Sequence, residues 1–182
     1  MNIKEITDQL IRHEGLRRKP YHCPAGRLTI GVGRNLEDKG ITENEAVMLL
    51  ENDVQECIAD LQDIFQGDPD TIDAPDTIDD SETIDAPDTT ADKENRFDLL
   101  PESAQRVLVD MRFNLGYQGF RKFKKMIKAV KQQDFHTAAR EMTDSRWYHQ
   151  VGERAKRLTE MMQGSSDTAD SSDSQDSAGT AP

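Results

Sequence analysis

The chain has 182 residues, of which 35 are Asp or Glu and 23 are Lys or Arg, so its formal net charge is −12. This length allows one compact domain or two small lobes. No apolar run approaches the roughly 18–20 residues that a membrane span requires, and the two cysteines are too few for a disulfide scaffold or a structural zinc site.

The negative charge is concentrated in two segments. Residues 68–94 contain eleven acids and one base, and residues 164–182 contain four Asp and no base. Residues 1–67 carry a net charge of −4, whereas residues 95–163 carry a net charge of +6. This asymmetry predicts two lobes with different tasks, the second of which faces something anionic.

The N-terminal part predicts a helix followed by a hairpin. Residues 2–14 have the apolar spacing of an amphipathic helix, and Gly15 is expected to end it. Residues 18–23 and 27–32 flank the turn sequence Pro24-Ala25-Gly26 and predict two paired strands.

A long helix is expected after the hairpin. Gly31 and Gly33 allow tight backbone geometry before a loop. Thr42 and Glu45 then form a capping box, in which each side chain accepts a hydrogen bond from the other residue's free amide. The helix that they open covers about residues 43–66, and we expect it to connect two lobes.

Residues 71–88 consist of three hexapeptides, TIDAPD, TIDDSE and TIDAPD. With one Ile each, they cannot bury enough apolar surface to offset about 1–2 kcal/mol of backbone entropy per residue. Repeated Asp also suits calcium, but no Gly turns such a loop and no Glu closes a twelve-residue frame. The pattern therefore favours an acidic low-complexity insert over residues 67–94.

The region 95–163 predicts an all-helical C-terminal lobe. Its predicted helices begin at Pro101 and then cover residues 120–132, 134–142 and 154–162. The helix over 120–132 is basic, with lysines on its outer side, and Trp147 and Tyr148 are assigned to the core. Residues 164–182 are mostly small and polar, which predicts a disordered acidic tail.

Three residues near the hairpin form a candidate catalytic group. Glu14 ends the first helix, Cys23 ends the first strand, and Thr29 lies on the second strand. A hairpin would place positions 23 and 29 opposite each other below Glu14, so that an acid, a nucleophile or base, and a hydroxyl converge. Each also has a simpler explanation: a solvated acid, a small core thiol or an ordinary strand residue.

The sequence around this group resembles the catalytic segment of the tailed-phage lysozymes, the endolysins of glycoside hydrolase family 24. The matching residues are Glu14-Gly15-Leu16-Arg17, Tyr21, Cys23 and Thr29-Ile30-Gly31-Val32-Gly33. Further matches to that family are Phe113-Asn114-Leu115-Gly116, Arg146-Trp147-Tyr148-x-Gln150 and Arg154-Ala155-Lys156-Arg157. The resemblance covers residues 1–66 and 95–163 in order.

The resemblance implies a two-lobed α+β lysozyme-like fold and a muramidase. The family cleaves the β-1,4 bond between N-acetylmuramic acid and N-acetylglucosamine in peptidoglycan, without a cofactor. Glu14 would be the general acid that protonates the glycosidic oxygen as an oxocarbenium-like transition state forms, which calls for partial burial or a hydrogen bond to its neutral form. Arg154 matches a family arginine that approaches this glutamate, so it is expected to join the lobes and orient the carboxyl.

Cys23 occupies a position that most members of the family fill with Asp, which with Thr29 is thought to activate a water. A free thiol with a pKa of about 8.5 is only a few per cent thiolate at neutral pH. The cations that would lower this pKa, if their side chains point inward, are Arg17, Arg18, Lys19 and Arg27. A thiolate would either assist the water or attack the anomeric carbon, so inversion and retention both stay open.

Other site residues are assigned supporting roles. Tyr21 is expected to support the site beside Thr29, and the candidates for contacting the sugar are Asn35, Phe113 and Asn114. His13 and His22 flank the catalytic group, but neither belongs to an HxxxH or HxH pair, so no metal is predicted.

Alternative functions come from other classes. The cationic helix over 121–131 would suit an anionic bilayer, a lytic transglycosylase would release 1,6-anhydro sugars, and the few aromatic residues argue against nucleic-acid binding. We expect a monomer that binds peptidoglycan strands and does not insert stably into a membrane. Because residues 1–15 lack the apolar core of a signal peptide, we expect it to stay in the host cytoplasm until a holin-like pore releases it to the periplasm.

Overall fold

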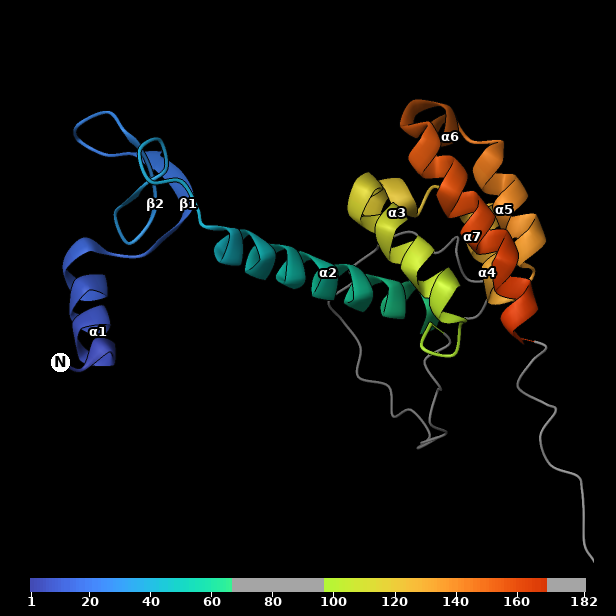
Figure 1. The fold of residues 1–182 in the computed structure, drawn as a ribbon, viewed down its shortest axis with the longest axis horizontal. Helices are drawn as coiled ribbons and strands as arrows, with labels where there is room; N and C mark the ends of the chain where they lie inside the picture. The colour runs from blue at the N-terminus through green and yellow to red at the C-terminus, as the bar shows by residue number, and fades with distance from the viewer. Residues whose placement is uncertain (67–96, 170–182) are drawn as a thin grey trace, which may run out of the picture. The chain divides into compact units, whose positions relative to one another are not determined.

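The computed structural model describes residues 1–66 and 97–169. The described chain combines a small antiparallel sheet with helices (Figure 1), which confirms the α+β class predicted from the sequence. It divides into two compact units, Met1–Asn52 and Asp53–Pro182, called here the N-terminal and C-terminal units. The predicted acidic insert over 67–94 lies outside the described residues.

The N-terminal unit begins with helix α1, Ile3–Glu14, as predicted. The Asn2 side chain caps it by accepting a hydrogen bond from the Lys4 amide at 3.1 Å. Gly15 ends it with a φ of 75°, a conformation that favours glycine, and its N–H donates to the Ile11 carbonyl at 2.9 Å. This cap fixes Glu14 as the last helical residue.

Three antiparallel strands follow in the order β1-β2-β3: Arg17–His22, Leu28–Gly31 and Arg34–Asn35. The first two form the predicted hairpin. The third lies where a loop was expected, because Gly31 and Gly33 have φ values of 67° and 72° and turn the chain back onto β2.

Helix α2, Glu43–Gln66, has the predicted bounds and extends from the N-terminal unit into the C-terminal unit. The predicted capping box is confirmed, since the Thr42 amide donates to Glu45 Oε2 at 2.8 Å and the Glu45 amide donates to Thr42 Oγ1 at 3.2 Å. Arg34 on β3 also donates to Glu45 Oε2, at 2.5 Å, and ties the sheet to the start of α2.

Glu45 should make the N-terminal unit sensitive to acid. The hydrogen bond from Arg34, followed by those from Thr42, lowers the pKa of Glu45 to about 2. Because the folded pKa is depressed, this carboxylate stabilises the fold above its unfolded pKa of about 4.3. That contribution should disappear as the pH falls toward 2.

The matching experiment compares thermal unfolding of wild type, Glu45→Gln and Glu51→Gln from pH 6 to pH 2. Glu51 is an exposed acid of the same helix. The midpoint difference between wild type and Glu45→Gln should be largest near pH 6 and shrink in acid, whereas Glu51→Gln should follow wild type throughout. If the midpoint difference between wild type and Glu45→Gln is constant with pH, the ionised Glu45 carboxylate does not stabilise the fold.

The C-terminal unit contains the rest of α2 and, within residues 97–169, only helices, as predicted. These helices are α3 Glu102–Phe120, α4 Lys124–Lys131, α5 Phe135–Thr143, α6 Arg146–Val151 and α7 Glu153–Ala169. Helix α7 packs against α3, α5 and α6, and α4 packs against α5 (Figure 1). Fully buried side chains at the centre of this core include Phe65, Leu108, Met111, Phe120 and Met142. Trp147 is buried and Tyr148 packs against the core, so their predicted core assignment is confirmed.

Two helix boundaries differ from the prediction. Helix α4 starts at Lys124 instead of residue 120, because the buried Phe120 ends α3. Helix α7 continues past Gly164 to Ala169, so the first residues of the predicted disordered tail are helical. The rest of that tail, residues 170–182, lies outside the described residues. The buried Ser165 explains the extension: its hydroxyl lies 2.7 Å from the Ser103 hydroxyl and donates to a carbonyl of its own helix. None of these described helices has both the length and the apolar character that crossing a membrane requires.

A buried arginine fastens α3 to α2 in the C-terminal unit. Arg112 is 8% exposed, its Nε donates to Asp60 Oδ2 at 2.7 Å, and Glu56 lies 3.4 Å from its other end. Burial works to lower the pKa of Arg112, but the hydrogen bond and charge of Asp60 raise it overall. The arginine therefore remains charged in the core and depends on its acidic partners.

Arg112→Ala should destabilise the protein by about 2–3 kcal/mol, somewhat less than the 3–5 kcal/mol typical of a fully buried pair, since Asp60 retains 27% side-chain exposure. Urea unfolding provides the measurement. Arg106→Ala is the control, because this arginine is exposed on the same helix, and it should change the stability by no more than about 0.5 kcal/mol. Equal effects of the two variants would contradict the role of the Arg112 ion pair.

Candidate functional site

The sheet aligns three of the predicted site residues in one row. Thr29 on β2 pairs with Tyr21 on β1 and with Asn35 on β3. Directly paired residues of antiparallel strands project to the same face, so these three side chains share one side of the sheet. Cys23 follows Tyr21 by two positions and therefore belongs to that face too.

Cys23 and Thr29 both bind the turn residue Arg27, but they are not the predicted cross-strand pair. The Cys23 amide donates to the Arg27 carbonyl at 3.0 Å, and the pairing partner of Thr29 is Tyr21. The hairpin turn is thus tighter than expected. The Thr29 hydroxyl donates to the same Arg27 carbonyl at 2.9 Å, so both residues bind one atom of the turn. Thr29 is 3% exposed, whereas Cys23 is half-buried.

The pKa of the Cys23 thiol is lowered from its ordinary value. The largest cause is a hydrogen bond from the Arg27 backbone, opposed by burial and assisted by the backbone of Ala25 and the hydroxyl of Thr29. The Arg27 guanidinium makes a separate contact, since it pairs with Glu37 at 3.1 Å. The sequence suggested that cationic side chains would lower this pKa, but the turn's own hydrogen bonds do so.

Glu14 stands at the C-terminal end of α1, close to the turn between β2 and β3. A Cβ atom built on Gly33 would lie 3.9 Å from the Glu14 Oε2 atom. The missing side chain at position 33 thus leaves room beside this carboxylate. The Glu14 side chain is exposed, so the partial burial expected for a general acid is not provided by residues 1–52.

Tyr21 on β1 and Asn35 on β3 flank Thr29 and make contacts of their own. The Arg17 guanidinium lies over the Tyr21 ring, 4.2 Å from its centroid. The Asn35 side chain accepts hydrogen bonds from the amides of Glu37 and Asp38, at 2.9 and 3.1 Å. Tyr21 is therefore braced by a cation, and Asn35 orders the loop that follows β3.

The other predicted site residues lie in the C-terminal unit. Phe113 is 45% exposed on α3. Asn114 next to it accepts a hydrogen bond from the Trp147 indole at 2.9 Å and so connects α3 to α6. Arg154 pairs with Asp110 at 2.8 Å, which holds the start of α7 against α3.

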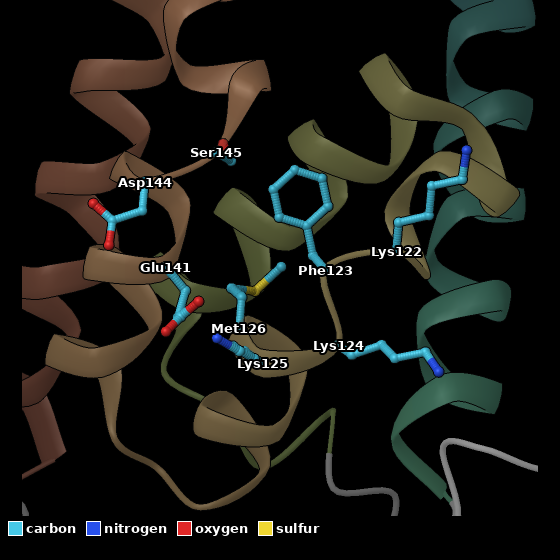
Figure 2. Close-up of a pocket in the computed structure, with 8 residues that line it drawn as sticks. All are labelled: Lys122, Phe123, Lys124, Lys125, Met126, Glu141, Asp144 and Ser145. Carbon is cyan, nitrogen blue, oxygen red and sulfur yellow. The ribbon is translucent and has the colours of Figure 1, made fainter.

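A cavity of about 470 Å³ lies beside this region in the C-terminal unit (Figure 2). Phe123 and Met126 provide its apolar surface, and Phe123 meets Trp147 edge-on with their ring centroids 6.2 Å apart. Glu141 and Asp144 line one side. The remaining lining residues are Lys122, Lys124, Lys125 and Ser145.

Sequence spacing did not reveal several of these partners. Asp110 lies 44 positions before Arg154, and Asp60 lies 52 positions before Arg112. Such separations carry no periodic signal. Within residues 1–66 and 97–169, no three His, Cys, Asp or Glu side chains gather closely enough to hold a metal ion.

Comparison with known proteins shows what the chain is similar to. Residues 11–73, which include Glu14, Cys23 and Thr29, match the phage lysozyme family. A probable T4-type lysozyme 2 of Dictyostelium discoideum is 24% identical over 88% of this chain and 95% of its own length. The pre-baseplate central spike protein Gp5 of Enterobacteria phage T4 is 29% identical over 85% of this chain, which covers only 27% of that protein. The predicted resemblance to phage-type lysozymes is thereby confirmed.

Proposed function

We propose that this chain is a muramidase that hydrolyses the β-1,4 bond between N-acetylmuramic acid and N-acetylglucosamine in peptidoglycan. The match of residues 11–73 to the phage lysozyme family supports lysozyme activity. The observation that carries the finer proposal is the Arg27 carbonyl, which accepts hydrogen bonds from the Cys23 amide at 3.0 Å and from the Thr29 hydroxyl at 2.9 Å, on the hairpin that follows Glu14. In this proposal Glu14 supplies the acid, and Cys23 with Thr29 supplies the water-binding pair, all from the N-terminal unit.

Glu14 is the proposed general acid. Glycosidic oxygen is a poor leaving group, so it must be protonated as the oxocarbenium-like transition state forms. Glu14 is exposed at the end of α1, so its carboxyl is accessible to a polymer. The bound glycan would exclude water from this carboxyl, which favours the neutral form that donates the proton.

Cys23 and Thr29 are proposed to position the water that attacks the anomeric carbon. The lowered pKa of Cys23 increases the fraction of thiolate, which accepts a proton from water more readily than a thiol does. Thr29 is buried between its strand neighbours, so its hydroxyl has a fixed location. In this mechanism a proton moves from water to the Cys23 sulfur while Glu14 gives its proton to the leaving oxygen.

The proposed substrate contacts are Asn35 in the N-terminal unit and Phe113 and Asn114 in the C-terminal unit. Arg154 is proposed to orient the acid, and Tyr21 to support Thr29. The wider proposal is a monomeric endolysin that causes host lysis after a holin-like pore gives it access to the periplasmic wall.

Burial of the apolar side of α4 argues against membrane disruption. Met126, Ile127 and Val130 are at most 1% exposed, so they pack in the core and are not displayed to a bilayer. A lytic transglycosylase remains a testable rival, since it would leave 1,6-anhydro ends in place of the reducing ends that hydrolysis produces.

Digestion of purified sacculi tests the proposal. Wild-type protein should release soluble fragments that end in reducing N-acetylmuramic acid, and it should leave dye-loaded anionic vesicles intact. Fragments with 1,6-anhydro ends would show that the protein is a lytic transglycosylase and not a hydrolase. Vesicle leakage without new reducing ends would favour membrane disruption.

A further inference from the structure

Glu37, in the loop after β3, binds both sides of one residue junction in the hairpin. Its Oε1 atom accepts a hydrogen bond from the Leu28 amide at 3.4 Å. Its Oε2 atom accepts a hydrogen bond from the Arg27 guanidinium at 3.1 Å. Each oxygen of this carboxylate thus has its own partner where the turn enters β2.

Strand β3 ends too early to pair with the Leu28 amide through its own backbone. It consists of Arg34 and Asn35, and one further backbone bond runs from the Leu36 amide to the Leu28 carbonyl at 2.8 Å. In an antiparallel pair, the N–H and the C=O of a residue face the same neighbouring strand. The Leu28 amide therefore faces the side of β3, where the Glu37 side chain supplies the acceptor that a longer strand would have supplied.

The loop after β3 is ordered so that Glu37 reaches this amide. Asn35 Oδ1 accepts a hydrogen bond from the Glu37 amide at 2.9 Å, and Asn35 Nδ2 donates to Asp38 at 2.7 Å. The Asp38 carboxylate also lies 3.9 Å from the Arg27 guanidinium. The position of Glu37 is therefore specified by contacts on its own loop as well as by those to the hairpin.

The other side of the same peptide bond holds two residues of the candidate site. The Arg27 carbonyl, which shares this peptide bond with the Leu28 amide, accepts hydrogen bonds from the Cys23 amide at 3.0 Å and from the Thr29 hydroxyl at 2.9 Å. An acceptor bound to the N–H of a peptide polarises its carbonyl, so the hydrogen bonds on the two sides strengthen each other. Glu37 is therefore coupled to Cys23 and Thr29 through one peptide bond.

This bonding determines how the Thr29 hydroxyl meets a water molecule. A hydroxyl has one hydrogen to donate and two lone pairs that accept. Because Thr29 gives its hydrogen to the Arg27 carbonyl, its lone pairs are left to accept a hydrogen bond from the water. A carbonyl that is held in place thus keeps the hydroxyl in one orientation.

We propose that Glu37 is a positioning residue for Cys23 and Thr29. Its carboxylate holds the Arg27–Leu28 peptide, and the carbonyl of that peptide holds the Thr29 hydroxyl and the Cys23 amide. This role rests on the proposed function, because it gives Glu37 a part in placing the attacking water. The bond to the Leu28 amide is the important one, since the side chains of the Arg27–Glu37 ion pair are 54% and 46% exposed and such pairs contribute little.

Substitutions at position 37 separate the amide bond from the charge. Glu37→Gln removes the charge but keeps an oxygen that accepts from the Leu28 amide, whereas Glu37→Leu has a similar length and no acceptor. Glu51→Leu is the matched control, because Glu51 is an exposed acid of the same N-terminal unit. Circular dichroism checks folding, and Glu37→Ala, which also lacks the acceptor, is used in place of Glu37→Leu if that protein is unfolded.

Two quantities are measured for each variant: the kinetics of reducing-end release from purified peptidoglycan, and the pH midpoint of Cys23 alkylation by N-ethylmaleimide. Glu37→Leu should lower the maximal rate about tenfold and leave the half-saturating substrate concentration unchanged, because a misplaced water affects the transition state. Its alkylation midpoint should rise, since the Arg27 backbone, which lowers the pKa of Cys23, is then held less firmly. Glu37→Gln and Glu51→Leu should stay within about twofold of the wild-type rate.

Equal maximal rates of Glu37→Gln and Glu37→Leu would overturn the proposal, since the acceptor would then have no effect. A change in the half-saturating concentration alone would also overturn it, because Glu37 would then be a substrate contact. Alkylation requires no hydrolysis, so the two proposals fail separately. A wild type that releases no reducing ends refutes the proposed function, whereas an unchanged alkylation midpoint in Glu37→Leu refutes the positioning role of Glu37.

Discussion

Glu14→Gln is expected to reduce the rate of reducing-end release from purified peptidoglycan by about 10²–10⁴-fold, the usual contribution of a general acid. Glutamine has nearly the same shape but cannot donate a proton to the leaving oxygen. The loss should appear in the maximal rate more than in the half-saturating substrate concentration, because the proton is transferred only in the transition state. The measurement is a reducing-sugar assay at saturating and limiting substrate.

The matched control for this experiment is Glu5→Gln. Glu5 is an exposed glutamate of the same helix, α1, so its replacement changes the net charge equally without touching the site. Its activity should equal that of wild type. A folded Glu14→Gln protein with wild-type activity would remove Glu14 from the mechanism.

Alkylation of Cys23 should abolish most of the activity. N-ethylmaleimide should modify Cys23 and not Cys57, because Cys57 is 2% exposed and burial, the largest cause, raises the pKa of its thiol. Because the pKa of Cys23 is lowered by the hydrogen bonds of the turn, its alkylation rate should fall at a lower pH than that of an ordinary cysteine thiol as the pH decreases. Intact-mass spectrometry measures the extent of labelling, and lysis assays on the same samples measure the remaining activity.

Two substitutions at position 23 provide the controls for this prediction. Cys23→Asp should retain activity and resist N-ethylmaleimide, since a carboxylate can also accept a proton from water. Cys23→Ser should lose activity, because a hydroxyl is rarely ionised near neutral pH. Complete labelling of Cys23 with full activity would contradict its role.

Local signals in the sequence predicted much of the N-terminal unit. Gly15 ends α1, the capping box of Thr42 and Glu45 starts α2, and alternation with a Pro-Ala-Gly turn gives the hairpin. Each of these features depends on residues within a few positions of one another. That is why the bounds of α1 and α2 could be predicted closely.

Features that depend on distant residues could not be predicted in this way. Strand β3 exists only because it pairs with β2, and the extension of α7 depends on the contact between Ser165 and Ser103. The pairing of Thr29 with Tyr21 follows from the tightness of the hairpin turn. A shift of register of this size is beyond what turn composition specifies.

The residues of the candidate site stay a prediction, and the structure adds local geometry that the sequence did not specify. The sequence placed Cys23 and Thr29 on one hairpin, but it did not predict that the backbone of the turn lowers the pKa of Cys23. The basic residues near position 23 suggested that cations would lower the pKa of Cys23, whereas the Arg27 guanidinium is paired with Glu37. Which way a long side chain turns depends on partners that the local sequence does not specify.

The most direct test of the proposed hydrolysis is digestion of purified sacculi in water enriched in ¹⁸O, followed by mass spectrometry of the fragments. The mechanism predicts one ¹⁸O atom in the hydroxyl at C1 of each newly formed N-acetylmuramic acid, and little such product with Glu14→Gln. Unlabelled 1,6-anhydro ends, or label in a peptide carboxyl group, would show that a different bond or a different reaction is involved.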